Sequence, residues 1–450
     1  MAEPIISVSG LRGIVGETLT AETALRYTAA FAAQMPAGAM VITRDGRPSG
    51  EVLAEAISAG LRGAGRDVLD AGIAATPTTG VLIRAQGAAG GIQISASHNP
   101  APYNGIKLFS AEGRVIPAGP GQAVLEAYRA GHAAWVPHDR LGRRHAVADP
   151  HAEHLKTVLA TVDVARIRRR KFRVLLESNH GAGSILGRRL LDELGCCVVQ
   201  LGGSPDGCFE HTPEPTAENL VGVLPQVRSA EVDVGFCQDP DADRLAVIDE
   251  SGRYLGEEYT LAMCVAHVLQ RRKGPVVANC ASSRMTEDLA LRHGVPYVRA
   301  AVGEANVVDA MLEHRAVFGG EGNGGPIDPT VGLVRDSFVG MAVLLDAMAE
   351  RGEPIGRLAD ELPRYEIVKT KIALPSPRVP AALDALQRHF PNAQPDRLDG
   401  LRLDWPGRWL LVRASNTEPI VRAIAEAPTE LEAKRLCEEA AQVIAAVDRA

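Results

Sequence analysis

The feature that most constrains the fold is a layout that occurs three times along the chain. Residues 39–72, 172–203 and 274–303 each start with a short aliphatic run, which continues through a polar loop into an apolar pattern at helical spacing. A glycine ends each helical pattern, at Gly65, Gly195 and Gly294, and a second strand pattern follows. Strands that alternate with helices in this way predict α/β units with parallel or mixed sheets.

Each of these repeats is followed by a further strand that runs into a polar loop. These segments are residues 90–100, 232–249 and 315–326, and their loops are rich in Ser and His, in Asp, and in Gly, respectively. In open α/β sheets, ligands gather beyond the carboxyl ends of the strands. We therefore expect the three loops to form three walls of one site.

The C-terminal part has a different pattern. Residues 365–374 and 400–416 read as strands, and residues 431–447 form an amphipathic helical pattern, which together predict a smaller α+β unit. The expected fold class is thus α/β, with three similar α/β domains followed by a smaller α+β domain. The expected domain ranges are 1–150, 151–252, 253–364 and 365–450.

Composition excludes several classes of protein. The 450 residues are enough for three or four domains, and 46% hydrophobic with 23% charged residues is typical of a globular chain. A net charge of -7 disfavours general nucleic-acid binding. No apolar run approaches the roughly 18 residues that span a bilayer, so we expect no membrane insertion. The N-terminal residues lack the pattern of a signal peptide.

Cysteine usage indicates the compartment. The chain has 7 Cys, none of them in a CxxC pattern, and several lie within apolar runs. Neither a disulfide framework nor a zinc site is indicated. We therefore predict a protein of the reducing cytoplasm.

Three aspartates, Asp239, Asp241 and Asp243, alternate just before the apolar run LAVID, from which Arg244 alone separates them. On an ideal strand they would share one face and repel one another, and a divalent cation such as Mg²⁺, which prefers oxygen ligands, would relieve that repulsion. An EF-hand is excluded because Arg244 stands where that loop needs Gly and because the flanking segments are strands. A solvated turn is the remaining alternative, and we favour the metal site.

Ser97 follows the strand pattern GGIQI within the segment SASHNP. A serine at a strand end beside His98 is suited to act as a nucleophile or to carry a transferred group. An ordinary polar loop is the alternative. No G-x-S-x-G surrounds Ser97, so the nucleophile elbow of an α/β-hydrolase is not supported.

The glycine-rich segment GGEGNGG, residues 319–325, formally contains G-x-G-x-x-G. A dinucleotide site would need a helix to begin there, but Pro326 and Pro329 follow and no helical pattern starts before about residue 332. We instead expect the glycines to let Glu321 and Asn323 approach a polar ligand. A carboxylate with an amide is suited to binding sugar hydroxyls.

The segment RASNTEPIVR, residues 413–422, concentrates groups that bind anions. Guanidinium groups, hydroxyls and the backbone N–H groups of a turn form a cradle for phosphate. A loop that only caps the following segment is the alternative. The candidate residues are Arg413, Ser415, Asn416, Thr417 and Arg422.

Taken together and in this order, these segments resemble the α-D-phosphohexomutase family. The resemblance covers essentially the whole chain and includes ISVSGLRG (6–13), RDGRPSG (44–50), TPTTG (76–80), YNGIKLF (103–109) and PEPTAENL (213–220). It implies four domains around a central cleft. It also implies an enzyme, an intramolecular phosphotransferase that moves phosphate between O6 and O1 of a hexose through a 1,6-bisphosphate intermediate.

The resemblance implies a role for each candidate residue. Ser97 would be carried as phosphoserine, and Mg²⁺ would bind to Asp239, Asp241 and Asp243, with a phosphate oxygen on Ser97 completing its shell. Arg244, together with Mg²⁺, would neutralise the phosphoserine, and Arg12 would stabilise the moving phosphoryl group. Glu321 would bind sugar hydroxyls, and the 413–422 segment would hold the phosphate that does not react.

The chain departs from the family in its sugar loop, which usually reads G-E-x-S-G-H. Here Asn323 replaces the Ser, and Gly325 replaces the His that is a candidate acid or base in many members. As general base we favour Lys107 with a lowered pKa, followed by His98. Lys107 acting only as a phosphate-binding cation is almost as well supported.

The preferred sugar stays open. Loops of the GEGNGG type resemble a branch often assigned as phosphoglucosamine mutases, so we expect that activity, with phosphomannomutase or phosphoglucomutase as the alternative. A sugar phosphatase, a sugar kinase and a non-catalytic sugar-phosphate sensor are further alternatives, but the chain has no G-x-x-x-x-G-K-[ST] for a kinase. Partners would be sugar phosphates, with a hexose 1,6-bisphosphate as activator, and the protein would be a monomer or a homodimer.

Overall fold

Three of the four sheets share one strand order. We describe a computed structural model of the chain, covering residues 3–415 and 419–449. The shared order is β4-β3-β5-β6 in the first unit, β9-β8-β10-β11 in the second and β13-β12-β14-β15 in the third. In each unit the first three strands of that order are parallel, and the last pairs antiparallel with its neighbour. The threefold layout predicted from the sequence is therefore confirmed.

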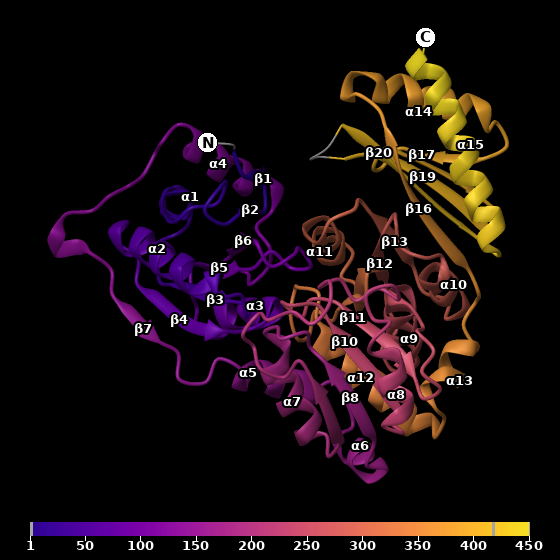
Figure 1. Ribbon diagram of the computed structural model, residues 1–450, viewed down its shortest axis with the longest axis horizontal. Coiled ribbons are helices and arrows are strands. Elements are labelled where there is room, and N and C mark those ends of the chain that lie inside the picture. The colour runs from indigo at the N-terminus through magenta and orange to yellow at the C-terminus, as the bar shows by residue number, and fades with distance from the viewer. Residues whose placement is uncertain (1–2, 416–418, 450) are drawn as a thin grey trace.

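The first unit, indigo to purple in Figure 1, adds strands at both edges of its sheet, whose full order is β1-β2-β6-β5-β3-β4-β7. Its elements are β1 Ile5–Ser7, β2 Gly10–Ile14, α1 Ala21–Gln34, β3 Met40–Arg44, α2 Ser49–Gly63, β4 Val68–Ile73, α3 Thr76–Ala85, β5 Gly90–Ile94, β6 Tyr103–Ser110, α4 Ala118–Arg129 and β7 Arg144–Ala146.

The second and third units share one hydrophobic core, in which α12 is buried on almost every side. The second unit contains α5 Ala152–Leu159, α6 Val164–Arg170, β8 Arg173–Glu177, α7 Gly183–Glu193, β9 Cys197–Leu201, α8 Leu224–Ser229, β10 Val234–Gln238 and β11 Leu245–Asp249. The third contains α9 Glu257–Arg271, β12 Val276–Asn279, α10 Met285–Arg292, β13 Tyr297–Ala300, α11 Glu304–Glu313, β14 Phe318–Glu321, β15 Gly325–Ile327, α12 Ser337–Arg351 and α13 Ile355–Asp360.

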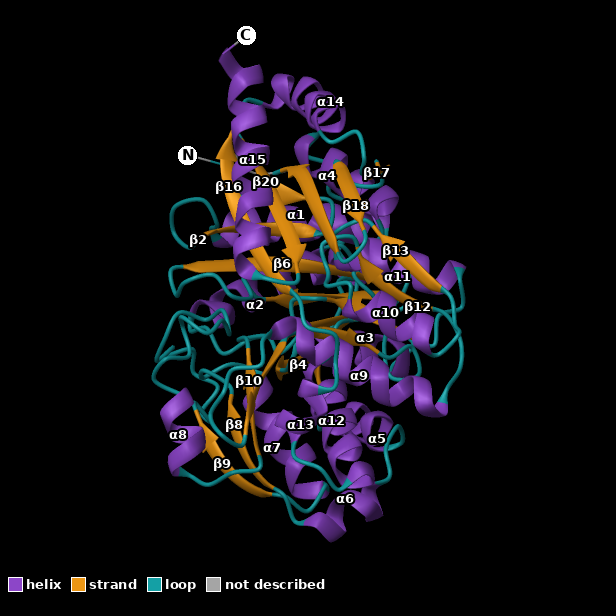
Figure 2. Cartoon of the chain, turned by 90° about the vertical axis from the view of Figure 1, so that its right-hand side faces the viewer, coloured by secondary structure: helices purple, strands orange, loops and turns teal. Residues whose placement is uncertain are grey.

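The fourth unit is an antiparallel sheet of order β16-β20-β19-β18-β17, with two helices packed on one face (Figure 2). Its elements are β16 Glu366–Ala373, α14 Val379–His389, β17 Gln394–Asp396, β18 Leu401–Trp405, β19 Arg408–Ala414, β20 Ile420–Ala427 and α15 Glu430–Arg449. Residues alternate along β19, so Leu410 packs with the helices while Trp409 and Leu411 pack against Cys280 of the third unit. The fourth unit therefore rests on the third.

The glycines that end the repeated helices confirm one local prediction. Gly65, Gly195 and Gly294 lie just beyond α2, α7 and α10 with φ of 74°, 72° and 66°. This left-handed conformation turns the chain out of a helix and is nearly free of strain only for glycine.

Across the described residues, no helix combines the length and apolar character needed to cross a membrane.

Candidate active site

The three loops singled out in the sequence connect equivalent strands. Ser97 lies between β5 and β6, the aspartates lie between β10 and β11, and Asn323 lies between β14 and β15. Each pair of strands is the antiparallel pair at the end of the shared order. The three units thus present the same hairpin toward one region, as the sequence predicts.

Ser97 is held in an unusual backbone conformation. Its φ is +49°, in the left-handed region that a non-glycine residue adopts at a cost, and such strain gathers at functional sites. Its backbone N–H donates to Oγ of Ser95 at 2.9 Å, and that hydroxyl donates to Oδ2 of Asp45 at 2.7 Å. The turn directs Oγ of Ser97 toward the second unit, where it donates to Oδ2 of Asp239 at 2.7 Å.

Arg47 holds this loop from within the first unit, and sequence reasoning assigned it no role. Its guanidinium is 1% exposed and is ion-paired with Asp45 at 3.1 Å. It donates to four backbone carbonyls of the loop, those of Ser97, Asn99, Pro100 and Tyr103, at 2.6–3.1 Å. The one sequence signal was its place in the family-like segment RDGRPSG.

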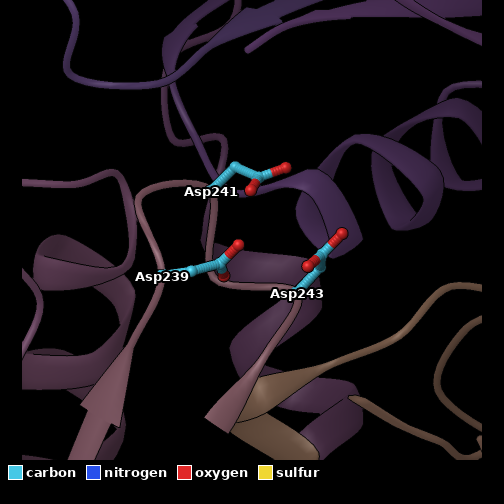
Figure 3. Close-up of side chains that lie close together, drawn as sticks. All are labelled: Asp239, Asp241 and Asp243. Carbon is cyan, nitrogen blue, oxygen red and sulfur yellow. The ribbon is translucent and has the colours of Figure 1, made fainter. Parts of the chain in front are cut away.

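The three aspartates converge, as predicted (Figure 3). One carboxylate oxygen of each lies within 4.8 Å of the others, and all three side chains are buried. Oδ1 of Asp241 and Oδ1 of Asp243 are buried without any hydrogen-bond partner in the described structure. Burial and the carboxylates of Asp243 and Asp241 raise the pKa of Asp239 well above its usual range. Orphaned, mutually repelling oxygens of this kind fit a divalent cation.

The remaining oxygens of the cluster are bound by groups from other units. Lys107 on β6 lies 2.5 Å from Oδ2 of Asp241 and 3.1 Å from Oδ2 of Asp243. Thr76, at the start of α3, donates its hydroxyl to the Asp241 oxygen that Lys107 contacts. Arg335 of the third unit donates to Oδ2 of Asp243 at 2.7 Å. These partners orient the carboxylates and leave the Oδ1 atoms for a cation.

The expected lowered pKa of Lys107 is wrong. Burial lowers the pKa of this ammonium, but the negative charges of Asp241 and Asp243 outweigh burial, and the pKa is raised. A lowered pKa would require Lys107 to lie mainly among cations, whereas its ammonium pairs directly with two of the aspartates. Lys107 is therefore a fixed positive charge in this arrangement.

His98, Arg12 and Arg244 surround Ser97. Nδ1 of His98 lies 3.4 Å from Oγ of Ser97, and burial together with the charges of Arg244 and Arg12 lowers the pKa of His98 to about 3. Arg12 donates to the side chain of Asn99 at 3.2 Å. Arg244 pairs with Glu214 at 3.1 Å. A neutral imidazole between guanidinium groups makes this end of the site favourable for an anion.

Glu321 is firmly held in the sugar loop. Its Oε1 accepts from Nδ2 of Asn279 at 2.7 Å and from the backbone N–H of Gly303 at 3.2 Å, and its Oε2 pairs with Arg335 at 2.9 Å. Carboxylate oxygens accept more than one hydrogen bond each, so Oε2 retains capacity for a ligand. Oδ1 of Asn323 is buried without a partner in the described structure.

Arg335 explains why residue 325 is glycine. A Cβ at Gly325 would lie 2.4 Å from Cδ of Arg335, so the guanidinium stem fills the space of a side chain there. Arg335 also pairs with Glu304 at 2.8 Å. Its guanidinium therefore contacts three carboxylates, those of Asp243, Glu304 and Glu321. No local sequence pattern indicates a role for Arg335.

A cleft of about 460 Å³ lies among these loops and the fourth unit. Residues from all four units line it, among them His98, Glu214, Glu258, Glu321, Asn323 and Arg413.

The fourth unit contributes a row of cations to this cleft. Arg413 on β19 is directly opposite Arg422 on β20, which is directly opposite Lys371 on β16. Three cationic side chains that line one cleft attract an anion, so this row is suited to phosphate. Arg413 is steadied by Asp399 at 3.0 Å, and the N–H of Ser415 donates to the carbonyl of Ile420. The predicted Asn416 and Thr417 lie outside the described residues.

Four domain models match this chain in order. They describe phosphoglucomutase/phosphomannomutase alpha/beta/alpha domains I, II and III, at residues 5–134, 149–252 and 257–365, and the C-terminal domain, at residues 371–443. The chain belongs to the phosphoglucomutase/phosphomannomutase family. The predicted family, fold class and enzyme class, an intramolecular phosphotransferase of the phosphohexomutase type, are confirmed.

Relatives cover the chain from end to end. A probable phosphoglucosamine mutase of Thermococcus kodakarensis is 34% identical over 441 residues, covering 97% of both chains. A phosphoglucomutase/phosphomannomutase of the same organism is 37% identical over 439 residues, covering 95% of this chain and 96% of its own. A crystal structure of a Burkholderia thailandensis protein of this family superposes with a TM-score of 0.86 at 26% identity, covering 98% of each chain.

Proposed function

We propose that the enzyme moves phosphate between O6 and O1 of a hexose through phosphoserine 97 and a hexose 1,6-bisphosphate. The observation that carries this proposal is the hydrogen bond of 2.7 Å between Oγ of Ser97 and the aspartate cluster, formed between two units of the chain. A hydroxyl that leads into a cation site is suited to exchange a phosphoryl group, since such transfers depend on alignment and charge neutralisation.

Asp239, Asp241 and Asp243, with an oxygen of the phosphorylated Ser97, would hold Mg²⁺. The bound ion supplies positive charge to the phosphoryl group during transfer. Arg244, Arg12 and the ammonium of Lys107 add charge from the protein. As the bond between Oγ and phosphorus breaks, the sugar hydroxyl oxygen bonds to phosphorus and gives up its proton, and Oγ of Ser97 takes up one proton. His98, whose Nδ1 lies 3.4 Å from Oγ, is placed to pass this proton from the sugar hydroxyl to Oγ.

The other end of the cleft binds the part of the substrate that does not react. Glu321 and Asn323 accept hydrogen bonds from sugar hydroxyls. Arg413 and Arg422 hold the distal phosphate, and Ser415, Asn416 and Thr417 complete the cradle by the family resemblance. The sugar must bind in two orientations, one for each transfer, whereas a phosphate occupies the cradle both times.

For the substrate we propose glucosamine phosphate, with mannose and glucose phosphates as the alternative. Support comes from the GEGNGG loop and from relatives whose names include probable phosphoglucosamine mutase. We further propose a cytoplasmic enzyme, active as a monomer or homodimer. The presence of Ser97, the cluster of three aspartates and the cation row argues against a non-catalytic sensor.

Ser97→Ala tests this proposal. The variant should lose turnover of every hexose phosphate, by at least about 10⁴-fold, because covalent catalysis needs the hydroxyl, while its circular dichroism and melting temperature stay close to those of the wild type. Ser229→Ala, at an exposed serine on α8, is the control and should keep full activity. Turnover by the Ser97→Ala enzyme within tenfold of the wild type would refute the proposal.

A further inference from the structure

Glu258, in the first turn of α9, lies in the cleft against the sugar loop and is not one of the residues to which the proposed function gives a role. Its Oε2 accepts from the backbone N–H of Ser283 at 2.8 Å. A Cβ built on Gly322 would lie 1.9 Å from that oxygen. The carboxylate therefore occupies the space of a side chain between Glu321 and Asn323, the two residues assigned to the sugar hydroxyls.

Glu258 differs from the other carboxylates of the cleft in its partners. Glu214 is paired with Arg244 and Glu321 with Arg335, whereas Glu258 forms no ion pair in the part of the chain that the structure describes. Burial raises the pKa of Glu258 to about 8, and the charge of Lys369 on β16 only partly opposes this. A cation bound beside Glu258 would stabilise its ionised form.

We propose that Glu258 binds a protonated amine at carbon 2 of the sugar, and so makes the enzyme select hexosamine phosphates. The inference rests on the proposed function. Carbon 2 is bonded to carbon 3, so a ring whose 3-hydroxyl contacts Glu321 or Asn323 presents its carbon 2 substituent beside Gly322, where Glu258 lies, in one of the two orientations that the sugar adopts. An ammonium there gains a charge-assisted hydrogen bond, about twice as strong as the neutral bond that a hydroxyl of glucose or mannose would form.

Glu258→Gln tests the proposal because it keeps the shape and removes the charge. kcat/KM is measured for glucosamine 1-phosphate and glucose 1-phosphate in one preparation, and their ratio is independent of the fraction of folded enzyme. The ratio should fall about 10- to 100-fold, the worth of a charged hydrogen bond. Glu258→Asp should recover part of the preference. Glu257→Gln, on the same helical turn but outside the cleft lining, should leave the ratio within twofold of the wild type.

The outcomes separate this inference from the proposed function. An unchanged ratio in Glu258→Gln, with wild-type enzyme that turns over glucosamine phosphate, overturns the inference alone. Equal losses on both sugars also overturn it, since Glu258 would then serve the reaction common to all substrates, for example by carrying a proton. Wild-type enzyme that turns over glucose phosphate and not glucosamine phosphate overturns the proposed substrate and the inference with it.

Discussion

The site has two ends that differ in structure. We call the region of Ser97 and the three aspartates the transfer end, and the region of Arg413, Arg422 and Lys371 the gripping end. At the transfer end, Ser97 is 1% exposed, the three aspartates are fully buried, and groups of three units already bond to one another. At the gripping end, the row of Arg413, Arg422 and Lys371 faces the cleft, and Arg422 is exposed. The proposed phosphoserine and cation stay with the protein and suit a buried, ordered site, whereas a phosphate that arrives from water needs an open one.

The domain contacts follow the same division. The aspartate cluster is contacted by Lys107 and Thr76 of the first unit and by Arg335 of the third, so the transfer end forms where three units meet. The fourth unit instead rests on the third, through Trp409 and Leu411 packed on Cys280. We therefore expect changes at the transfer end to lower kcat, and changes at the gripping end to act mainly on KM.

The largest effect after loss of Ser97 is expected for Asp241→Asn. This change removes the charge of one of the three converging carboxylates, which also pairs with Lys107, so Mg²⁺ affinity should fall and kcat should drop at least about 10³-fold. Titration calorimetry with Mg²⁺ and steady-state kinetics measure the two effects. Asp249→Asn, at the end of β11 and outside the cluster, is the matched control. Unchanged Mg²⁺ binding in the Asp241 variant would remove the cation site from the account.

An intermediate effect is expected for Arg413→Ala. Losing a charge-assisted contact with a group that all substrates share should lower kcat/KM about 10- to 100-fold, chiefly through KM, and equally for glucosamine, glucose and mannose phosphates. Arg408→Ala, on the same strand but stacked near Trp405 outside the cleft, serves as control. A fall confined to kcat would place Arg413 at the transfer end and break the division described above.

The smallest effect is expected for Asn323→Ser. Its Oδ1 has no partner among the described residues, so a shorter hydroxyl should alter contacts with the sugar and leave phosphate binding intact. We expect the ratios of kcat/KM among the three sugar phosphates to change by about three- to tenfold, since selection between sugars depends on contacts at their hydroxyls or amine. If Arg413→Ala changes these ratios and Asn323→Ser does not, the roles assigned to the two loops are reversed.

The features that could be predicted from the sequence, the three similar units and the aspartate cluster, are those that short-range patterns encode. Repeated strand and helix patterns gave the three similar units, and the alternation of Asp239, Asp241 and Asp243 gave the cluster. Arg335 and Lys371 could not be predicted in this way. Arg335 is 92 positions from Asp243, and its presence is marked only by the missing side chain at Gly325. Lys371 joins the cation row through strand register, which one sequence does not specify.

The central claim is that the transfer end gives its phosphoryl group to a sugar held by the other end. The most direct test starts from enzyme with a labelled phosphoryl group on Ser97 and adds excess glucosamine 6-phosphate for a single turnover. We expect the label to leave the protein and to appear in a hexose 1,6-bisphosphate. Label that appears as inorganic phosphate would indicate a phosphatase, and label that stays on Ser97 would indicate a sensor; either result would exclude the proposed phosphoryl transfer.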